Sequence, residues 1–235
     1  MPDDARQGRR RVILEASKKS GVRVHSVMNM DHWRYPLSSG DRSAVDKCIA
    51  GMETSLRNAK LWGADTVLLV PGVVNPETSY SQVWERSQKE IRKMLPLATE
   101  LKVIIAVENV WNKFLLSPME FVRYVDDFNS PYVKAYFDVG NVLLTGFPHD
   151  WVRTLGPRIA KMHIKDFKFK GDPSVKGRSN ADWVNLREGM LDWKALHQAL
   201  GEIKYHGTAT VELNSGDADY LKDLSSRFDK ILSGE

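Results

Sequence analysis

The sequence has one cysteine and no long apolar run, and each of these absences excludes a class of protein. A single cysteine, Cys48, cannot form an intrachain disulfide, which excludes a disulfide framework and fits a reducing cytosol. No apolar segment approaches the roughly 20 residues that cross a bilayer, and no apolar core follows the charged N-terminus as it would in a secretion signal. We therefore expect a cytoplasmic protein without a membrane partner.

The sequence also lacks a large excess of basic over acidic residues. The net charge is +4, from 34 basic and 30 acidic residues. The most basic run, Arg9–Arg11, lies between Asp3, Asp4 and Glu15 in one expected helix. A solvated helix face is therefore favoured over a nucleic-acid patch. We expect no nucleic-acid partner.

The chain alternates between two kinds of segment. Its 235 residues, 42% hydrophobic and 27% charged, suit one globular domain covering residues 1–235. Short runs rich in β-branched residues predict strands, and amphipathic stretches such as Val45–Trp62 and Tyr80–Thr99 predict the helices between them. The six expected strands are Val22–Asn29, Thr66–Gly72, Val103–Asn109, Val133–Asn141, Ile159–Phe167 and Thr208–Asn214.

This alternation predicts βα units and a parallel sheet, either open or closed. Open dinucleotide-binding sheets usually carry a G-x-G-x-x-G loop after a strand, and the sequence has no such motif. A barrel instead places its site residues at the C-terminal ends of several strands, which is where charged residues fall here. We predict an α/β fold of the (β/α)₈ TIM-barrel type, with six of its strands evident.

Four of the expected strands carry metal-binding residue types at or toward their ends. In a barrel these ends converge, and three carboxylates in one pocket need a compensating cation. An oxygen-rich set with one imidazole suits one divalent metal, Mn²⁺, Mg²⁺, Co²⁺ or Zn²⁺. The alternative is separate salt bridges at the rim, with Lys165 and Arg187 as partners, but repetition at four strands favours a metal. The four residues are Glu108, Asp138, His163 and Glu212.

The motifs VEN, FDVGN, HIKD, REGMLDW and VELN, in this order, resemble those of the xylose-isomerase-like barrels. Within that group the chain looks most like the ketose and ketose-phosphate 3-epimerases, particularly those that act on L-ribulose or L-xylulose 5-phosphate. The segment HWRYPLSS, His32–Ser39, is also similar to that branch. The resemblance implies a small-molecule sugar or sugar phosphate as the partner.

The resemblance also implies roles for the strand-end residues. Glu108, Asp138, His163 and Glu212 match the metal ligands of the family, and the two glutamates match its acid/base pair. The implied reaction is epimerisation of a ketose at C3 through a cis-enediolate. One glutamate would remove the C3 proton and the other would return one from the opposite face, while the metal would stabilise the developing charge.

Further residues are candidates for substrate contact, and several have a structural alternative. Asn141 stands where many ketohexose 3-epimerases have histidine, and a turn role is equally open. Lys165 alternates to the same face as His163 and could instead form a rim salt bridge with Asp166 or another carboxylate. Trp111 would line the sugar or pack its own loop. The remaining candidates are His32, Arg34 and Arg187, the last at the end of a long loop that also carries Lys168, Lys170, Lys176 and Arg178.

Other interpretations stay open. An aldose–ketose isomerase or a keto-inositol dehydratase on the same scaffold would use the same metal site. A DNA-repair endonuclease of the related barrel type would need more strand-end histidines and is disfavoured. Because the family barrel has eight strands and the first expected strand aligns with the third of them, we expect two strands to be missing. Either the natural protein begins upstream of this chain, or the chain is an incomplete barrel whose unpaired edges a homodimer would cover. A non-catalytic incomplete barrel is a further alternative.

Overall fold

The computed structural model describes residues 3–171 and 180–235, and the chain divides into two compact units. The first unit contains the residues up to Glu108 and two short segments, 112–114 and 128–134. The second contains the residues from Ala135 onward, with segments 109–111 and 115–127. Strand β4, Val133–Asp138, therefore begins in the first unit and ends in the second.

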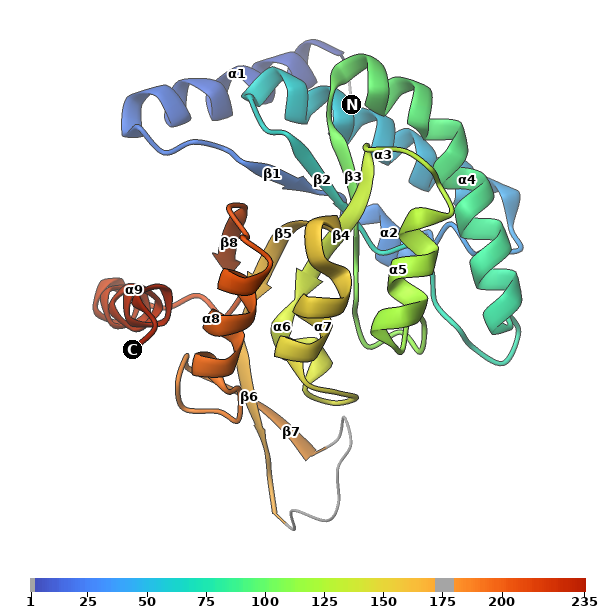
Figure 1. Ribbon diagram of the computed structural model, residues 1–235. Helices are drawn as coiled ribbons and strands as arrows, with labels where there is room; N and C mark the ends of the chain where they lie inside the picture. The colour runs from blue at the N-terminus through green and yellow to red at the C-terminus, as the bar shows by residue number, and fades with distance from the viewer. Residues whose placement is uncertain (1–2, 172–179) are drawn as a thin grey trace. The chain divides into compact units, whose positions relative to one another are not determined.

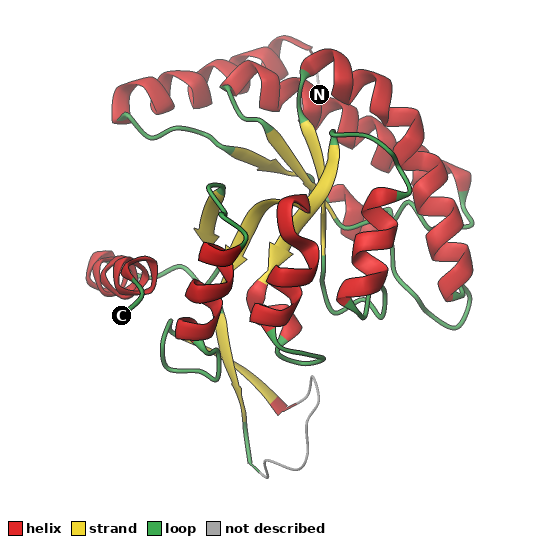
Figure 2. Ribbon diagram, viewed as in Figure 1, coloured by secondary structure: helices red, strands yellow, loops and turns green. Residues whose placement is uncertain are grey.

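Six strands form one sheet in the hydrogen-bonded order β1-β2-β3-β4-β5-β8 (Figure 2). The registers of β1 with β2, β2 with β3, β4 with β5 and β5 with β8 are all parallel. The structure thus confirms the six predicted strands and the parallel sheet. Besides β4, the strands are β1 (Ser26–Met28), β2 (Thr66–Leu69), β3 (Ile104–Glu108), β5 (Ile159–Ile164) and β8 (Thr208–Val211).

The first unit covers its strands with two long helices. Every residue of β2 is buried, as expected for a parallel strand with helical cover. Helix α3 packs against β1 and β2, and α4 packs against β3 (Figure 1). Asp41 caps α3 by accepting from the backbone N of Ser43, and Ser79 opens α4 with a capping box. The helices of this unit are α1 (Asp3–Ser20), α2 (Asp31–Arg34), α3 (Arg42–Trp62) and α4 (Tyr80–Leu101).

The second unit is built around the pair β5 and β8. Helices α7 and α8 pack side by side, and α6 packs against β5 (Figure 1). Helix α5 begins with Pro118 and is capped by Ser117, whose hydroxyl accepts from the backbone N of Glu120 at 3.2 Å. The helices are α5 (Pro118–Asp126), α6 (Val139–Val142), α7 (Pro148–Leu155), η1 (Gly156–Arg158), α8 (Trp193–Glu202) and α9 (Ala218–Ser233). Among the described residues, no helix is both long and apolar enough to cross a membrane.

One antiparallel pair of strands was not expected from the sequence. The antiparallel pair consists of β6 (Asp166–Phe169), which begins inside the predicted strand Ile159–Phe167, and β7 (Ala181–Val184), which lies in the segment expected to be a long loop. Each strand has only four residues. So short a segment does not show enough alternation of apolar and polar residues to distinguish a strand from a loop. Lys176 and Arg178 lie outside the described residues.

Candidate metal centre

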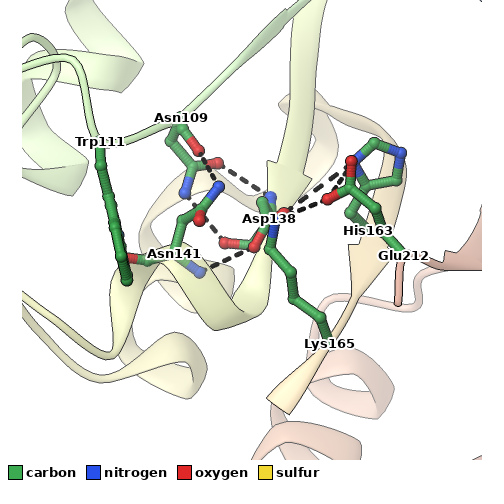
Figure 3. Close-up of polar contacts among 7 residues, drawn as sticks. All are labelled: Asn109, Trp111, Asp138, Asn141, His163, Lys165 and Glu212. Atoms are coloured by element: carbon green, nitrogen blue, oxygen red, sulfur yellow. Dashed lines mark hydrogen bonds and ion pairs between the residues drawn. The ribbon is translucent and has the colours of Figure 1, made fainter. Parts of the chain in front are cut away.

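Three of the expected ligands come together at the ends of β4, β5 and β8 (Figure 3). His163 is in register with Asp138 on β4 and with Thr210 on β8. Glu212 lies two residues beyond Thr210, on the same face of the strand, and its backbone N still pairs with the carbonyl of Ile164 at 2.9 Å. The Nδ1 atom of His163 is 3.9 Å from Oδ2 of Asp138 and 3.5 Å from Oε2 of Glu212. The parallel register therefore brings two carboxylates and one imidazole close together.

A lysine ammonium group lies between these two carboxylates. Nζ of Lys165 is 2.7 Å from Oδ2 of Asp138 and 2.5 Å from Oε2 of Glu212. Burial alone would lower the pKa of Lys165, but the two negative charges outweigh it and raise that pKa. Burial would likewise raise the pKa of Glu212, but Lys165 and His163 outweigh it and lower that pKa. Glu212 is therefore ionised and Lys165 protonated at neutral pH.

Asp138 is fully buried and is held from both sides by asparagines. Its Oδ1 accepts from the backbone N of Asn141 at 2.7 Å and so caps α6. The side chain of Asn109 bonds the backbone N and the carbonyl of Asp138, each at 2.9 Å. Nδ2 of Asn141 in turn donates to the carbonyl of Asn109 at 2.9 Å (Figure 3). With Oδ1 engaged, Oδ2 is the oxygen that Asp138 turns toward Lys165 and His163.

Glu108 and Asn109 are neighbours in the chain, and of the two only Glu108 is predicted from the sequence to be a ligand. Glu108 is the buried last residue of β3 and belongs to the first unit. Asn109, which positions Asp138, was given no role. The role of Asn109 could have been inferred from its position directly after a buried carboxylate at a strand end, because a side-chain amide there can hydrogen-bond to the neighbouring strand.

Aromatic rings lie beside the lysine. Trp111 stacks on Trp183 with 5.2 Å between ring centroids, and its Nε1 donates to the carbonyl of Asn141 at 2.9 Å. Nζ of Lys165 lies 4.9 Å from the centroid of the Trp183 ring. The polar groups of Trp111 and Asn141, both candidates for substrate contact, thus bond within the protein. A Cβ at Gly140 would lie 2.6 Å from Cγ of Lys165, so only glycine leaves room for the lysine stem there.

Asp166, the residue after Lys165, holds the backbone of a loop. Its carboxylate is fully buried and accepts from the backbone N of Arg187 at 3.2 Å, Gly189 at 3.0 Å and Leu191 at 3.3 Å. Burial raises the pKa of Asp166, although these hydrogen bonds oppose the shift. The side chain of Arg187 is exposed, and its φ of 71° places it in the left-handed region. Arg187 is therefore fixed through its peptide group.

We expect Asp166→Ala to lower the free energy of unfolding by about 2–4 kcal/mol, because three loop N–H groups would lose their acceptor. Urea unfolding followed by circular dichroism measures the change. Asp229→Ala, at an exposed position of α9, is the control and should change stability by less than about 0.5 kcal/mol. Equal stability of the two variants would mean that water replaces Asp166 without loss.

The candidates His32 and Arg34 belong to the first unit. His32 is 1% exposed, and its Nδ1 accepts from the backbone N of Val70 at 3.4 Å. Its buried Nε2 has no hydrogen-bond partner within the part of the chain that the structure describes. Arg34 is exposed, with its guanidinium 5.3 Å from the ring centroid of Tyr35. His32 is thus a buried neutral imidazole, and Arg34 is the one of the two that solvent reaches.

The buried state of His32 predicts a loss of stability in acid. Burial lowers the pKa of His32 from 6.5 to about 4, so the unfolded chain takes up a proton below pH 6.5 while the folded protein does not. Stability is therefore greatest above pH 6.5 and falls toward pH 4, by up to about 3 kcal/mol from this residue. Urea unfolding at pH 7, 5.5 and 4.5 measures it. His32→Gln should flatten this dependence and the exposed His206→Gln should not; the same slope in both variants would contradict the assignment.

The comparisons with known proteins agree with this geometry. Residues 2–230 match the family described as Xylose isomerase-like TIM barrel. The chain is 24% identical over 213 residues to L-ribulose-5-phosphate 3-epimerase UlaE of Escherichia coli O1:K1 / APEC, which covers 89% of this chain and 71% of that protein.

Solved structures share the fold. A D-tagatose 3-epimerase-like protein is 17% identical with a TM-score of 0.81, over 95% of this chain and 82% of that one. A xylose isomerase-like TIM barrel protein from Mycobacterium smegmatis in complex with magnesium is 17% identical with a TM-score of 0.73, over 100% and 80% of the two chains. The resemblance and the barrel-type fold expected from the sequence are confirmed: the chain belongs to the xylose isomerase-like TIM barrel family.

Proposed function

We propose that this protein is a divalent-metal-dependent epimerase that inverts C3 of a ketose or ketose phosphate. The observation that carries the proposal is the convergence of Asp138, His163 and Glu212 at three neighbouring strand ends. The names of similar proteins, an L-ribulose-5-phosphate 3-epimerase and a D-tagatose 3-epimerase-like protein, support the substrate class.

The donor set suits a divalent cation. Asp138 and Glu212 offer carboxylate oxygens and His163 offers an imidazole nitrogen, a mixture that Mn²⁺, Mg²⁺, Co²⁺ and Zn²⁺ all accept. Two carboxylates that already gather around one ammonium group would hold a doubly charged ion at the same oxygens. We propose Glu108 as the fourth ligand, because it ends β3 and directly precedes Asn109, which holds the peptide of Asp138. A bound metal would polarise the ketone and its neighbouring hydroxyl, which makes the C3 proton more acidic.

Proton transfer at C3 falls to the two glutamates in this proposal. Glu212 is half-buried, and its pKa is lowered, so at neutral pH it is the base form that can accept a proton. Glu108 would deliver a proton to the opposite face of C3, which completes the inversion. Because each glutamate serves one face, either epimer can be the substrate.

The remaining polar groups would bind and orient the sugar. Lys165 and the partly exposed ring of Trp183 lie next to each other, and they would offer the sugar a cation and an apolar face. Arg34 and Arg187 are exposed cations that would suit a phosphate. His32, Trp111 and Asn141 would act mainly by shaping the site, because their described contacts are within the protein.

Hydrogen exchange tests the proposal directly. Metal-loaded protein would be incubated in D₂O with ketopentoses, ketohexoses and their phosphates, and the C3 proton followed by NMR. Metal-dependent loss of the C3 signal is the expected result, and the fastest substrate identifies the class. Exchange at C1 or C2 instead would assign an aldose–ketose isomerase. A folded, metal-binding protein without any exchange would support a non-catalytic role.

A further inference from the structure

The side chain of Lys165 contacts the same oxygens that a metal would need. Oδ1 of Asp138 is already used by the backbone N of Asn141, at 2.7 Å, so Oδ2 is the oxygen available for another ligand. Nζ of Lys165 lies 2.7 Å from that Oδ2 and 2.5 Å from Oε2 of Glu212. The same two oxygens face Nδ1 of His163. The ammonium group therefore lies between the two carboxylates of the donor set.

We propose that Lys165 is a competing cation, which neutralises Asp138 and Glu212 before metal binds and is displaced when metal arrives. The inference rests on the proposed metal site and adds a step to its loading. A metal bonded to these oxygens at roughly 2.0–2.6 Å would lie close to Nζ in its present place. Two cations so near repel each other, and one oxygen lone pair cannot serve both in the same direction. Metal binding and the present position of Lys165 therefore oppose each other.

The ring of Trp183 offers Lys165 a partner that does not depend on the carboxylates. Nζ is already 4.9 Å from the centroid of the Trp183 ring, and that residue is 40% exposed. An ammonium group that leaves the carboxylates can rest on this ring face. The backbone next to Lys165 is held, because Asp166 is clamped by three loop N–H groups. Displacement would therefore occur by rotation of the side chain.

Metal titration tests the proposal without using catalysis. Calorimetric titration with Mn²⁺ alone would compare the wild type with Lys165→Met, Lys165→Arg and the exposed-position control Lys168→Met. Without a competitor, Lys165→Met should bind Mn²⁺ about 10-fold tighter or more. Lys165→Arg, which keeps the charge, should bind no tighter than the wild type, and Lys168→Met should match the wild type.

Thermal unfolding gives a second, independent readout. The metal-free Met variant should melt below the wild type, because Asp138 and Glu212 lose their cation. Saturating Mn²⁺ should raise its melting temperature by more than it raises that of the wild type. If the metal-free Met variant does not fold, Lys165→Gln replaces it, and both are also refolded with Mn²⁺ and compared by chelator competition.

The possible results separate this inference from the proposed function. Weaker or unchanged Mn²⁺ binding in the Met and Gln variants would overturn the competition and leave the metal site standing. Failure of every protein to bind Mn²⁺ would overturn both. Tighter binding in the Met variant, together with absence of C3 exchange by the wild type, would support the competition and reject only the epimerase reaction.

Discussion

Glu212→Gln should slow exchange of the C3 proton by about 10³-fold or more while the protein remains folded. The amide has nearly the shape of the carboxylate but cannot accept the proton, and loss of a general base typically costs 10²–10⁴-fold. Loss of one anionic ligand would add to the effect. The substitution keeps an oxygen near Lys165, so the 2.5 Å contact has a neutral replacement. The measurement is the NMR exchange rate in D₂O with saturating metal.

Two comparisons make the result specific. Glu100→Gln, at an exposed position of α4, removes the same charge elsewhere and should leave the rate within about twofold of the wild type. Mn²⁺ affinity of Glu212→Gln, measured in parallel, separates loss of metal from loss of the base. A saturated Gln variant that exchanges at the wild-type rate would remove Glu212 from proton transfer.

Asp138→Asn should weaken metal binding by at least about 100-fold, which is the upper range even for groups that only support a ligand. The free energy of unfolding without metal should fall by about 1–3 kcal/mol, because the amide NH₂ takes the place of Oδ2 beside Lys165 and that ion pair is lost. The amide oxygen can still cap α6 through the backbone N of Asn141, and Lys165 keeps Glu212 as its partner. Titration with Mn²⁺ and urea unfolding without metal measure the two quantities separately.

Asp138→Ala is the contrasting variant at the same position. It loses the cap as well as the charge and leaves a cavity at a fully buried site. We expect a fall of about 2–4 kcal/mol in the free energy of unfolding, with metal binding as weak as in the Asn variant. Metal affinity that stays near the wild-type value in both variants would show that Asp138 is a structural residue and not a ligand.

The sheet and much of the site could be predicted because both depend on simple local rules. Buried parallel strands are rich in apolar and β-branched residues, and their carboxyl ends meet at one edge. Asp138, His163 and Glu212 were therefore expected to converge, and the register of β4, β5 and β8 brings them together. No knowledge of loop conformation was needed for this step.

What could not be predicted depends on contacts between segments far apart in the chain. Alternation gave the face of Lys165 but not its partner, which could have been Asp166 or another carboxylate. In the structure these two neighbouring residues have different partners. Lys165 forms ion pairs with Asp138 and Glu212. Asp166 instead accepts a hydrogen bond from the loop that follows β7. The pair β6 and β7 was missed for a similar reason, because four-residue strands are defined by pairing rather than by their own pattern.

The clamp formed by Asp166 has a consequence for how this family member can diversify. The Asp166 carboxylate accepts hydrogen bonds from peptide N–H groups, which every residue but proline possesses. These hydrogen bonds therefore do not depend on the side chains of the loop. Arg187, Glu188 and Met190 display exposed side chains on this loop, and Glu188 also pairs with Arg227 at 2.9 Å, whereas a Cβ at Gly189 would clash with Oδ1 of Asp166. A library randomised at those three positions, with Gly189 retained, would explore new substrate preferences on an unchanged scaffold.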